Sequence, residues 1–306
     1  MNQIINQDMT DYAHLVIPDY MRTLREAFGL APLVPTGQMA GKYMSFDEKM
    51  AFVVPNARRA SGGETKLIQF NGKPVDYVLD PNALKTYVDL EVELPLAGNA
   101  AGTLERAKVR TLISQAVNAY AVSVFDTVRA ATTPASGKGN WGDPAVDPLG
   151  EISGGIETVE EKSGLTPNVV TMSKSMWRQL IRHPKVLARF PGKTDALTPE
   201  RIALEMGETD LKIELVNGRG FRTENLGKKD DITVPFMGKS VYIHYRDELQ
   251  GAESPSFAAT LSENENMVDN VYEYTSDDGV LRYFRLPWKV KAVVKSKLLI
   301  YRIDAA

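Results

Sequence analysis

The chain of 306 residues contains no cysteine, which excludes disulfide bonds and thiolate metal sites. Long apolar runs are also missing, because no stretch approaches the roughly 20 residues that a membrane-spanning helix needs. The first residues have neither the basic nor the apolar region of a signal peptide, so we expect no membrane insertion. A basic excess is absent too, since 36 basic and 39 acidic residues argue against a dedicated nucleic-acid binder.

Recognisable catalytic motifs are missing as well. His14, His183 and His244 are far apart and lack the spacing of a metal site. We expect His183, which stands before a proline, to be a plain partner of a helix C-terminus. Gly137-Lys138-Gly139 resembles part of a phosphate loop, but it lacks the upstream glycine and the hydroxyl residue after the lysine. We therefore expect no enzyme and neither a metal nor a cofactor.

The first third of the chain is typical of extended structure. We expect residues 1–42 to form a loose arm around one short helix, which would run from Pro18 to Phe28. Residues 43–95 indicate a long β excursion with a flexible tip at Gly62 and Gly63. Strict alternation of apolar and acidic residues then predicts a half-buried strand over 88–94.

A long helix and an α/β region follow. The apolar spacing predicts a helix over 103–131, which becomes increasingly apolar and should therefore be a packed spine. Pro134 and the glycines after it mark a change of domain. In the α/β region we expect helices over 153–163, 173–182 and 198–207, and strands over 168–172, 211–216 and 239–245.

The C-terminal stretch alternates most clearly. Apolar residues from Phe284 to Ile300 share one face of the predicted strand. The other face is basic and carries Arg285, Lys289, Lys291, Lys295 and Lys297. Such a face meets an acidic partner or a nucleic acid, or it is simply solvated.

The central residues resemble those of a known family. The motifs that carry the resemblance are Trp141-Gly-Asp143-Pro144, Pro167-Asn168-Val-Val, Met172, Trp177, Leu180 and His183-Pro184. In order and spacing they are similar to the central domain of tailed-bacteriophage major capsid proteins. The resemblance implies an α+β class and the fold named after phage Hong Kong 97. Its parts would be an N-arm (1–42), an extended β-hairpin E-loop (43–95), a P-domain with a spine helix (96–139), a central α/β A-domain (140–265) and returning P-domain strands (266–306).

The resemblance also implies a function. Copies of the chain would assemble into pentamers and hexamers of an icosahedral shell around double-stranded DNA, in a virion built in the host bacterial cytoplasm. Further partners would be a separate scaffolding protein, a portal, the packaged DNA through weak non-specific contact and, optionally, a decoration protein. Two alternatives stay open: an encapsulin-like compartment shell or other polymerising phage protein, and an α/β enzyme with an unrecognised site.

Assembly contacts are expected at the tip of the β excursion, at Trp141 and on two charged strand faces. Trp141 lies in a loop between turns, where it is either an interface anchor or a locally buried plug. The acidic face of the 88–94 strand is complementary in charge to the basic C-terminal face. The candidate contact residues are Arg58, Arg59, Gly62, Gly63, Lys66, Asp89, Glu91, Glu93, Trp141, Arg285, Lys289 and Lys291.

Overall fold

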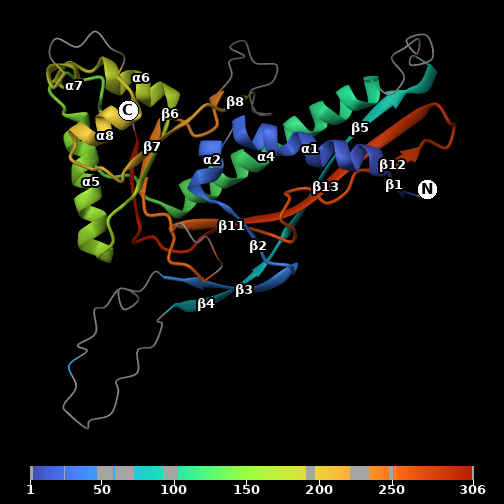
Figure 1. Ribbon diagram of the computed structural model, residues 1–306, viewed down its shortest axis with the longest axis horizontal. Coiled ribbons are helices and arrows are strands. Elements are labelled where there is room, and N and C mark those ends of the chain that lie inside the picture. Colours follow the sequence, from blue (N-terminus) through green and yellow to red (C-terminus); the bar gives the residue numbers. More distant parts are fainter. Residues whose placement is uncertain are drawn as a thin grey trace.

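A computed structural model describes residues 3–23, 25–46, 58, 72–91, 103–190, 197–220, 234–247, 251 and 253–304. The molecule is elongated, with a long helix and a long strand running side by side along it and a cluster of shorter helices at one end (Figure 1). Within the described residues, none of the helices combines the length and the apolar character needed to cross a membrane.

The spine helix α4 (Thr103–Ala131) confirms the helix predicted over 103–131. Its buried side chains recur at helical spacing and include Val109, Ile113, Val117 and Phe125. They form the centre of the largest hydrophobic core, which also takes in the apolar face of the longest strand.

The N-terminal segment differs from the loose arm expected from the sequence. Helix α1 (Gln7–Thr23) packs along α4 and buries Met9, Ala13 and Ile17 in the common core. A second helix, α2 (Arg25–Leu30), follows it. The prediction of one helix over 18–28 was wrong, because it took Pro18 as the start of a helix. Pro18 lies inside α1, and the buried residues of α1, four positions apart, fix that helix against the core.

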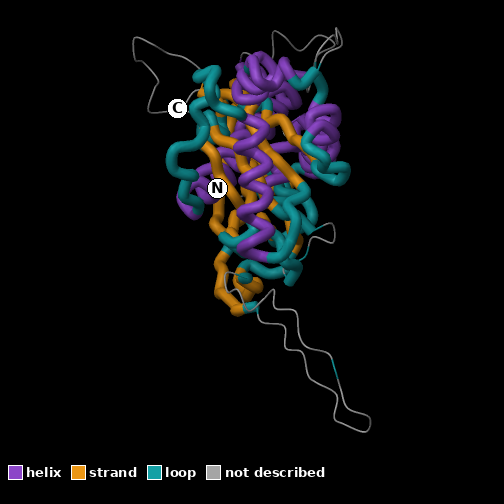
Figure 2. Tube along the Cα trace, turned by 90° about the vertical axis from the view of Figure 1, so that its left-hand side faces the viewer, coloured by secondary structure: helices purple, strands orange, loops and turns teal. Residues whose placement is uncertain are grey.

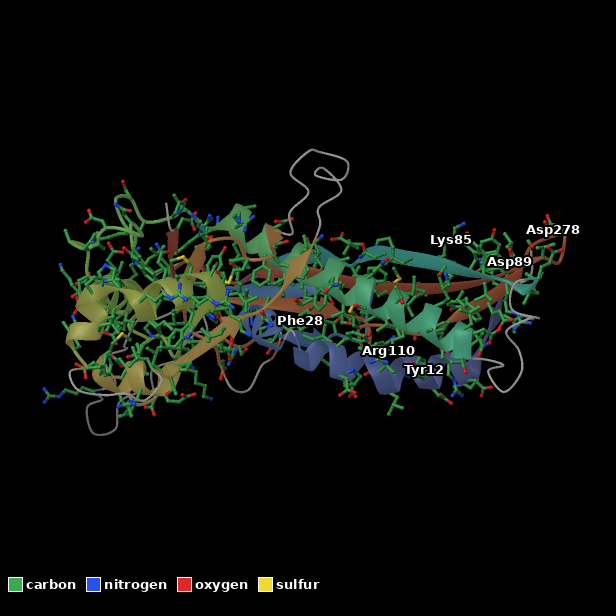
Figure 3. All side chains as sticks on the ribbon, turned by 90° about the horizontal axis from the view of Figure 1, so that it is seen from above. Tyr12, Phe28, Lys85, Asp89, Arg110 and Asp278 are labelled. Atoms are coloured by element: carbon green, nitrogen blue, oxygen red, sulfur yellow. The ribbon has the colours of Figure 1, made fainter. Side chains whose placement is uncertain are left out.

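Two cation–ring contacts fasten α1 to the spine. The guanidinium of Arg106 lies 5.9 Å from the ring centroid of Tyr12, and that of Arg110 lies 6.0 Å from the ring centroid of Tyr20. Arg110 also donates from Nε to the hydroxyl of Tyr20 over 3.2 Å. Figure 3 shows Tyr12 and Arg110 on the two neighbouring helices. Residues 7–23 are therefore an integral layer of this subunit.

The six-stranded sheet is organised by one long strand, β13 (Leu281–Val294). Along one edge β13 pairs antiparallel with β5 (Asp80–Asp89) over ten residue pairs. Along its other edge it pairs first with β12 (Tyr272–Thr275) and then with β11 (Ala258–Ser262), both antiparallel. The short strands β1 (Ile4–Ile5) and β2 (Leu33–Pro35) complete the sheet.

The strand predicted over 88–94 was wrong in its limits. Strand β5 ends at Asp89, and Leu90 and Glu91 are helical. The strand instead begins at Asp80 and contains Pro81, which the pairing tolerates because β5 is an edge strand. Alternation in the sequence identified the end of a strand but not its length.

The second sheet lies with the helix cluster. Its order is β14 (Ile300–Asp304), β10 (Ser240–His244), β6 (Val169–Ser173) and β7 (Lys212–Val216), and only β6 and β7 pair in parallel. The helices are α5 (Pro148–Ser163), α6 (Lys174–Arg182), α7 (Pro184–Ala188) and α8 (Pro199–Glu205). Strands β6, β7 and β10 and helices α6 and α8 agree with their expected limits to within two residues. Helix α5 begins at Pro148 instead of the expected residue 153, and α7 was not expected.

Gly155 sets the distance between α5 and this sheet. A Cβ atom at this position would collide with the side chain of Ile243 and would lie 2.8 Å from the ring of Tyr301. Helix α5 therefore contacts the sheet closely, and the smaller core that forms there includes Trp141, Ile152 and Met176.

A two-stranded ribbon includes described residues of the region where the β excursion was expected, 43–95. It consists of β3 (Ala40–Ser45) and β4 (Lys73–Val78), paired antiparallel (Figure 2). A second short ribbon pairs β8 (Arg219–Gly220) with β9 (Val234–Pro235). The expected tip and its candidates Arg59, Gly62, Gly63 and Lys66 lie outside the described residues, as does Glu93; Arg58 is exposed.

Candidate assembly interface

Strand β13 has the basic face that was expected, but only from Arg285 to Lys291. Phe284, Leu286, Trp288 and Val290 are buried, and the residues between them point to the other side and are partly exposed. Among those residues are Arg285, Lys289 and Lys291.

Each of these three cations binds a residue of its own subunit. Arg285 donates to the side chain of Gln3 over 3.1 Å, and Lys289 forms an ion pair with Glu263 at 2.8 Å. Lys291 donates to the carbonyl of Val78 over 3.1 Å and lies 3.7 Å from Asp80. The counter-charges expected from a partner are thus supplied in part from within. The pairing with Glu263 raises the pKa of the Lys289 ammonium.

Lys295 and Lys297 do not belong to this face, which corrects the expectation. Strand β13 ends at Val294, and the chain turns before β14. The Lys295 side chain is fully buried, where Nζ donates to the carbonyl of Gly251 over 2.8 Å and to that of Ser254. Burial lowers its pKa to about 8.

The buried lysine lies next to Phe46, just after the end of β3. Its Nζ lies 5.7 Å from the ring centroid of Phe46, the last described residue before segment 47–57. The amide of Phe46 donates to the carbonyl of Lys295 over 2.7 Å, and the hydroxyl of Ser296 donates to the carbonyl of Phe46 over 3.0 Å. Sequence reasoning missed this clamp, because a lysine next to an alternating strand is indistinguishable from a solvated one.

The acidic candidates lie far from the basic ones. Asp89 is opposite Leu281 in the β5–β13 register, whereas Lys289 is opposite Pro81. Eight residues of strand separate the two positions, about 26 Å at the usual rise. Figure 3 shows Asp89 close to Asp278, at the end of the molecule away from the helix cluster. Asp89 therefore does not supply the counter-charge of Lys289 inside one subunit.

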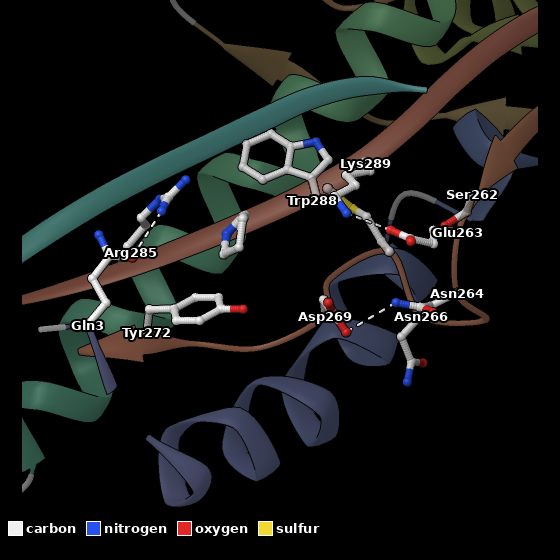
Figure 4. Close-up of a pocket in the computed structure, with 12 residues that line it drawn as sticks. Gln3, Ser262, Glu263, Asn264, Asn266, Asp269, Tyr272, Arg285, Trp288 and Lys289 are labelled. Carbon is white, nitrogen blue, oxygen red and sulfur yellow. Dashed lines mark hydrogen bonds and ion pairs between the residues drawn. The ribbon is translucent and has the colours of Figure 1, made fainter. Parts of the chain in front are cut away.

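A recess opens beside β13, between the parts of the strand that pair with β12 and with β11 (Figure 4). Its volume is about 310 Å³, and Trp288, Tyr272, Arg285 and Lys289 are among the residues that line it. Its charges are balanced in number, because the acids Glu263 and Asp269 and the cations Arg285 and Lys289 line it. The recess offers polar groups to a partner but holds no paired nucleophile and base.

Trp141 is a local plug. Its side chain is 2% exposed, and its Nε1 donates to Glu151 of α5 over 2.8 Å. The same carboxylate accepts from the amide of Gly139 over 2.9 Å. The candidate anchor is thus used inside the subunit to join the loop before α5 to that helix.

His183 has a different role from the one expected. The residue ends α6 and caps α7, where Nδ1 accepts from the amide of Lys185 over 3.3 Å. Its Nε2 donates to the carbonyl of Asp143 over 3.0 Å. The buried imidazole therefore connects the Asp-Pro turn to α6 and α7. Because the ring is buried, it does not interact with the helix end from the solvent side.

The other histidines are separate from it. His244 is buried, with Nε2 3.1 Å from the hydroxyl of Thr171, and burial lowers its pKa to about 3. His14 contacts the carbonyl of Asp269 on the surface over 2.9 Å. In the part of the chain that the structure describes, no group of three or more potential ligands could hold a metal.

Comparison with curated proteins finds phage capsid proteins. The chain is 26% identical over 174 residues to the major capsid protein of Pseudomonas phage JBD67, a match that covers 53% of this chain and 52% of that protein. It is 22% identical over 271 residues to the major capsid protein of Burkholderia phage BcepMu, covering 84% and 83%. The chain thus spans about half the length of the first of these relatives. No protein-family model matches the chain.

Comparison with solved structures gives likenesses over nearly the whole chain. A phage-related protein from Bordetella bronchiseptica has a TM-score of 0.74 at 19% identity, covering 99% of this chain and 98% of that one. The putative capsid protein of an E. coli prophage has a TM-score of 0.53 at 12% identity, with full coverage of both chains. An encapsulin from Synechococcus elongatus has a TM-score of 0.52 at 11% identity, covering 92% and 88%.

These likenesses show the fold. The order of ribbon, spine helix, α/β cluster and returning strand is the α+β order expected from the sequence. The chain has the Hong Kong 97-like coat fold, and its similarity to the major capsid proteins of tailed bacteriophages, first indicated by the residues around Trp141, is confirmed.

Proposed function

We propose that this chain is a phage or prophage major capsid protein, which assembles into pentamers and hexamers of an icosahedral shell around double-stranded DNA. The observation that carries the proposal is the similarity to the BcepMu major capsid protein over 84% of this chain, in a molecule with a coat-protein fold. The role is structural, and no residue is assigned to catalysis.

The shape and packing of the subunit agree with a building block of a shell. The spine helix and β13 make a long, well-packed body, since both bury continuous apolar faces in one core. In this proposal residues 1–42 are the N-arm, 43–95 the E-loop, 96–139 and 266–306 the P-domain, and 140–265 the A-domain. The E-loop lies across a neighbouring subunit, with its base held by Lys295.

Other partners follow from the function. A separate scaffolding protein and a portal direct assembly in the host bacterial cytoplasm, and the finished shell is part of the virion. The packaged DNA makes weak, non-specific contacts, which agrees with a net charge of −3, because each neutralised phosphate would increase the affinity for DNA. A decoration protein is an optional addition to the outer surface.

A compartment shell of the encapsulin type is the second candidate. The likeness to the Synechococcus elongatus encapsulin, at a TM-score of 0.52, favours it. Both candidates require self-association into closed shells, and they differ in contents, which are DNA in the first and a protein cargo in the second.

The test is to purify the protein after expression and to examine it by native mass spectrometry and electron microscopy. We expect rings of five and six copies, or closed and aberrant shells. A protein that stays monomeric at every concentration and ionic strength would contradict both candidates. Particles from the native host are then treated with nuclease, and protected DNA inside them distinguishes a phage shell from a compartment.

A further inference from the structure

A basic surface covers α6 and α7. It is defined by Lys174, Arg178, Arg182 and Leu187, all exposed. The three cations recur at every fourth residue of α6, so the helix places them on one side. Between Lys174 and Arg189 the sequence has five basic residues and no acidic one.

Two arginines of this surface, Arg178 and Arg182, have no counter-charge among the described residues. Lys185 and Arg189, at the margin, bind the carbonyl of Ala145 and the carboxylate of Asp147. Within the described part of the chain, Arg178 and Arg182 form neither a hydrogen bond nor an ion pair through their side chains. They line a recess of about 420 Å³ together with residues of the Trp141 loop.

An acidic groove lies on α8 and the start of β7. It is defined by Glu200, Leu204, Glu208 and Asp210, and its volume is about 740 Å³. The side chains of Glu208 and Asp210 have no ion-pair partner among the residues that the structure covers. Two cations, Lys212 and Arg246, and a further acid, Asp247, also line the groove.

The cations of the groove do not cancel its charge. Arg246 is occupied by Glu214, which binds it through both carboxylate oxygens at 2.8 and 3.1 Å. Lys212 is then the one other cation among the described residues that line the groove, against the four acids Glu200, Glu208, Asp210 and Asp247. The groove therefore keeps a negative potential, as the α6 surface keeps a positive one.

Each surface also carries an exposed leucine. Leu187 is 50% exposed beside the cations, and Leu204 is 62% exposed beside the acids. They are the large apolar residues of the α5–α8 cluster that are exposed in the described chain. An apolar side chain ringed by unpaired charge is the composition of a protein contact, since the apolar part is buried and the charges select the partner.

The two surfaces are separate, although both lie on the helices that cover the second sheet. Helix α6 packs on β6 and β7, and α8 packs on β7. The recess of the basic surface and the acidic groove have no lining residue in common. One copy can therefore offer its basic surface to one neighbour and its groove to another.

We propose that the basic surface of each subunit docks into the acidic groove of the next copy of this chain, head to tail around a ring. The inference rests on the proposed function, because a closed ring of more than two identical copies needs two different surfaces that fit each other. The charges and leucines described above supply such a pair. DNA as the occupant would account for the basic surface but would leave the groove unexplained.

Charge reversal tests the contact. We compare the wild type with Arg178→Glu/Arg182→Glu, with Glu208→Arg/Asp210→Arg, and with all four substitutions in one chain. Native mass spectrometry gives the fraction of protein in rings of five and six, and circular dichroism melting confirms that each variant folds. We expect each double variant to lose at least tenfold in ring fraction, and the combined variant to regain most of it, because the reversed charges again face each other.

The control is Lys138→Glu/Lys162→Glu, which changes the net charge as much as the first variant does, at two exposed positions outside both surfaces. It should assemble like the wild type. If the wild type forms rings and both double variants form them equally well, the inference is overturned while the proposed function stands. Failure of the combined variant to regain rings would also overturn it. A wild type that forms no rings would overturn the proposed function and this inference with it.

Discussion

Lys295 and Phe46, 249 positions apart in the sequence, are joined through both side chain and backbone. The ammonium of Lys295 faces the ring of Phe46 at 5.7 Å, and the amide of Phe46 donates to the lysine carbonyl over 2.7 Å. A buried ammonium with two carbonyl acceptors thus lies beside Phe46, the residue that follows β3.

Replacing Lys295 by Met should destabilise the subunit by about 1–3 kcal/mol. The substitution keeps the apolar stem but leaves the carbonyls of Gly251 and Ser254 without their buried donor. Urea unfolding of the wild type and the variant under conditions that keep both unassembled measures the difference. A variant as stable as the wild type would mean that water or another donor replaces the ammonium.

The same lysine should make stability rise with pH in the alkaline range. Its pKa is about 8 in the folded chain and near 10.5 when unfolded, so the folded state loses the proton first. Raising the pH from 8 to 10.5 therefore stabilises the fold by up to about 1.4 kcal/mol per unit. The difference in unfolding free energy between wild type and Lys295→Met should grow over this window, and a constant difference would contradict the assignment.

His244 should make the subunit sensitive to mild acid. Burial holds its pKa at about 3, below its ordinary value of 6.5, so protonation favours the unfolded chain. Its stabilising contribution is complete above pH 6.5 and is lost as the pH falls toward 3, by up to about 1.4 kcal/mol per unit. Between pH 6.5 and 5, unfolding of His244→Gln should depend less on pH than unfolding of the wild type; equal slopes would exclude this histidine.

Trp141→Phe should cost about 1–2 kcal/mol of stability in the unassembled subunit. The change keeps most of the apolar volume but removes the indole donor from the half-buried Glu151 carboxylate, which keeps the amide of Gly139. Thermal melting of unassembled protein gives the shift. If the variant melted like the wild type before assembly but formed weaker rings, Trp141 would be an interface residue after all.

The basic face of β13 should contribute little to shell stability. Because Lys289 and Lys291 already have Glu263 and Asp80 beside them, and such exposed pairs give only about 0–1 kcal/mol each, Lys289→Gln/Lys291→Gln should change shell melting by a few degrees at most. A salt series separates the readings. A wild-type shell that loses stability steeply toward 1 M salt while the variant does not would show that these cations bind a neighbour or the genome.

The parts of the fold that were predictable are those with dense local signals. Helix α4 shows its apolar spacing over its whole length, and the alternation from Phe284 to Val290 is the buried face of β13. Helix α1 was not recognised because its buried residues are few and Pro18 interrupts the pattern, so only contact with α4 reveals its face. Lys295 escaped prediction for a similar reason, since its partners at 46, 251 and 254 come from elsewhere in the chain.

The candidate interface was predictable to a smaller degree. Arg285, Lys289 and Lys291 do share a side of one strand, as the alternation indicated. Their pairing with Glu263 and Asp80 depends on long-range contacts that no local pattern contains. The stretch from Lys174 to Arg189 holds five basic residues and no acidic one, but only the structure places an acidic groove on the same helix cluster.

The antiparallel overlap of β5 and β13 has a mechanical consequence. Ten consecutive residue pairs join the two strands, and the hydrogen bonds lie across the direction in which the strands run. A pull along the long axis of the molecule therefore loads all these bonds together in shear, instead of opening them one after another as in a zipper. The subunit should resist stretching along this axis far better than peeling at its edge, so in the proposed shell it would be stiff in the plane of the wall wherever this axis lies in that plane.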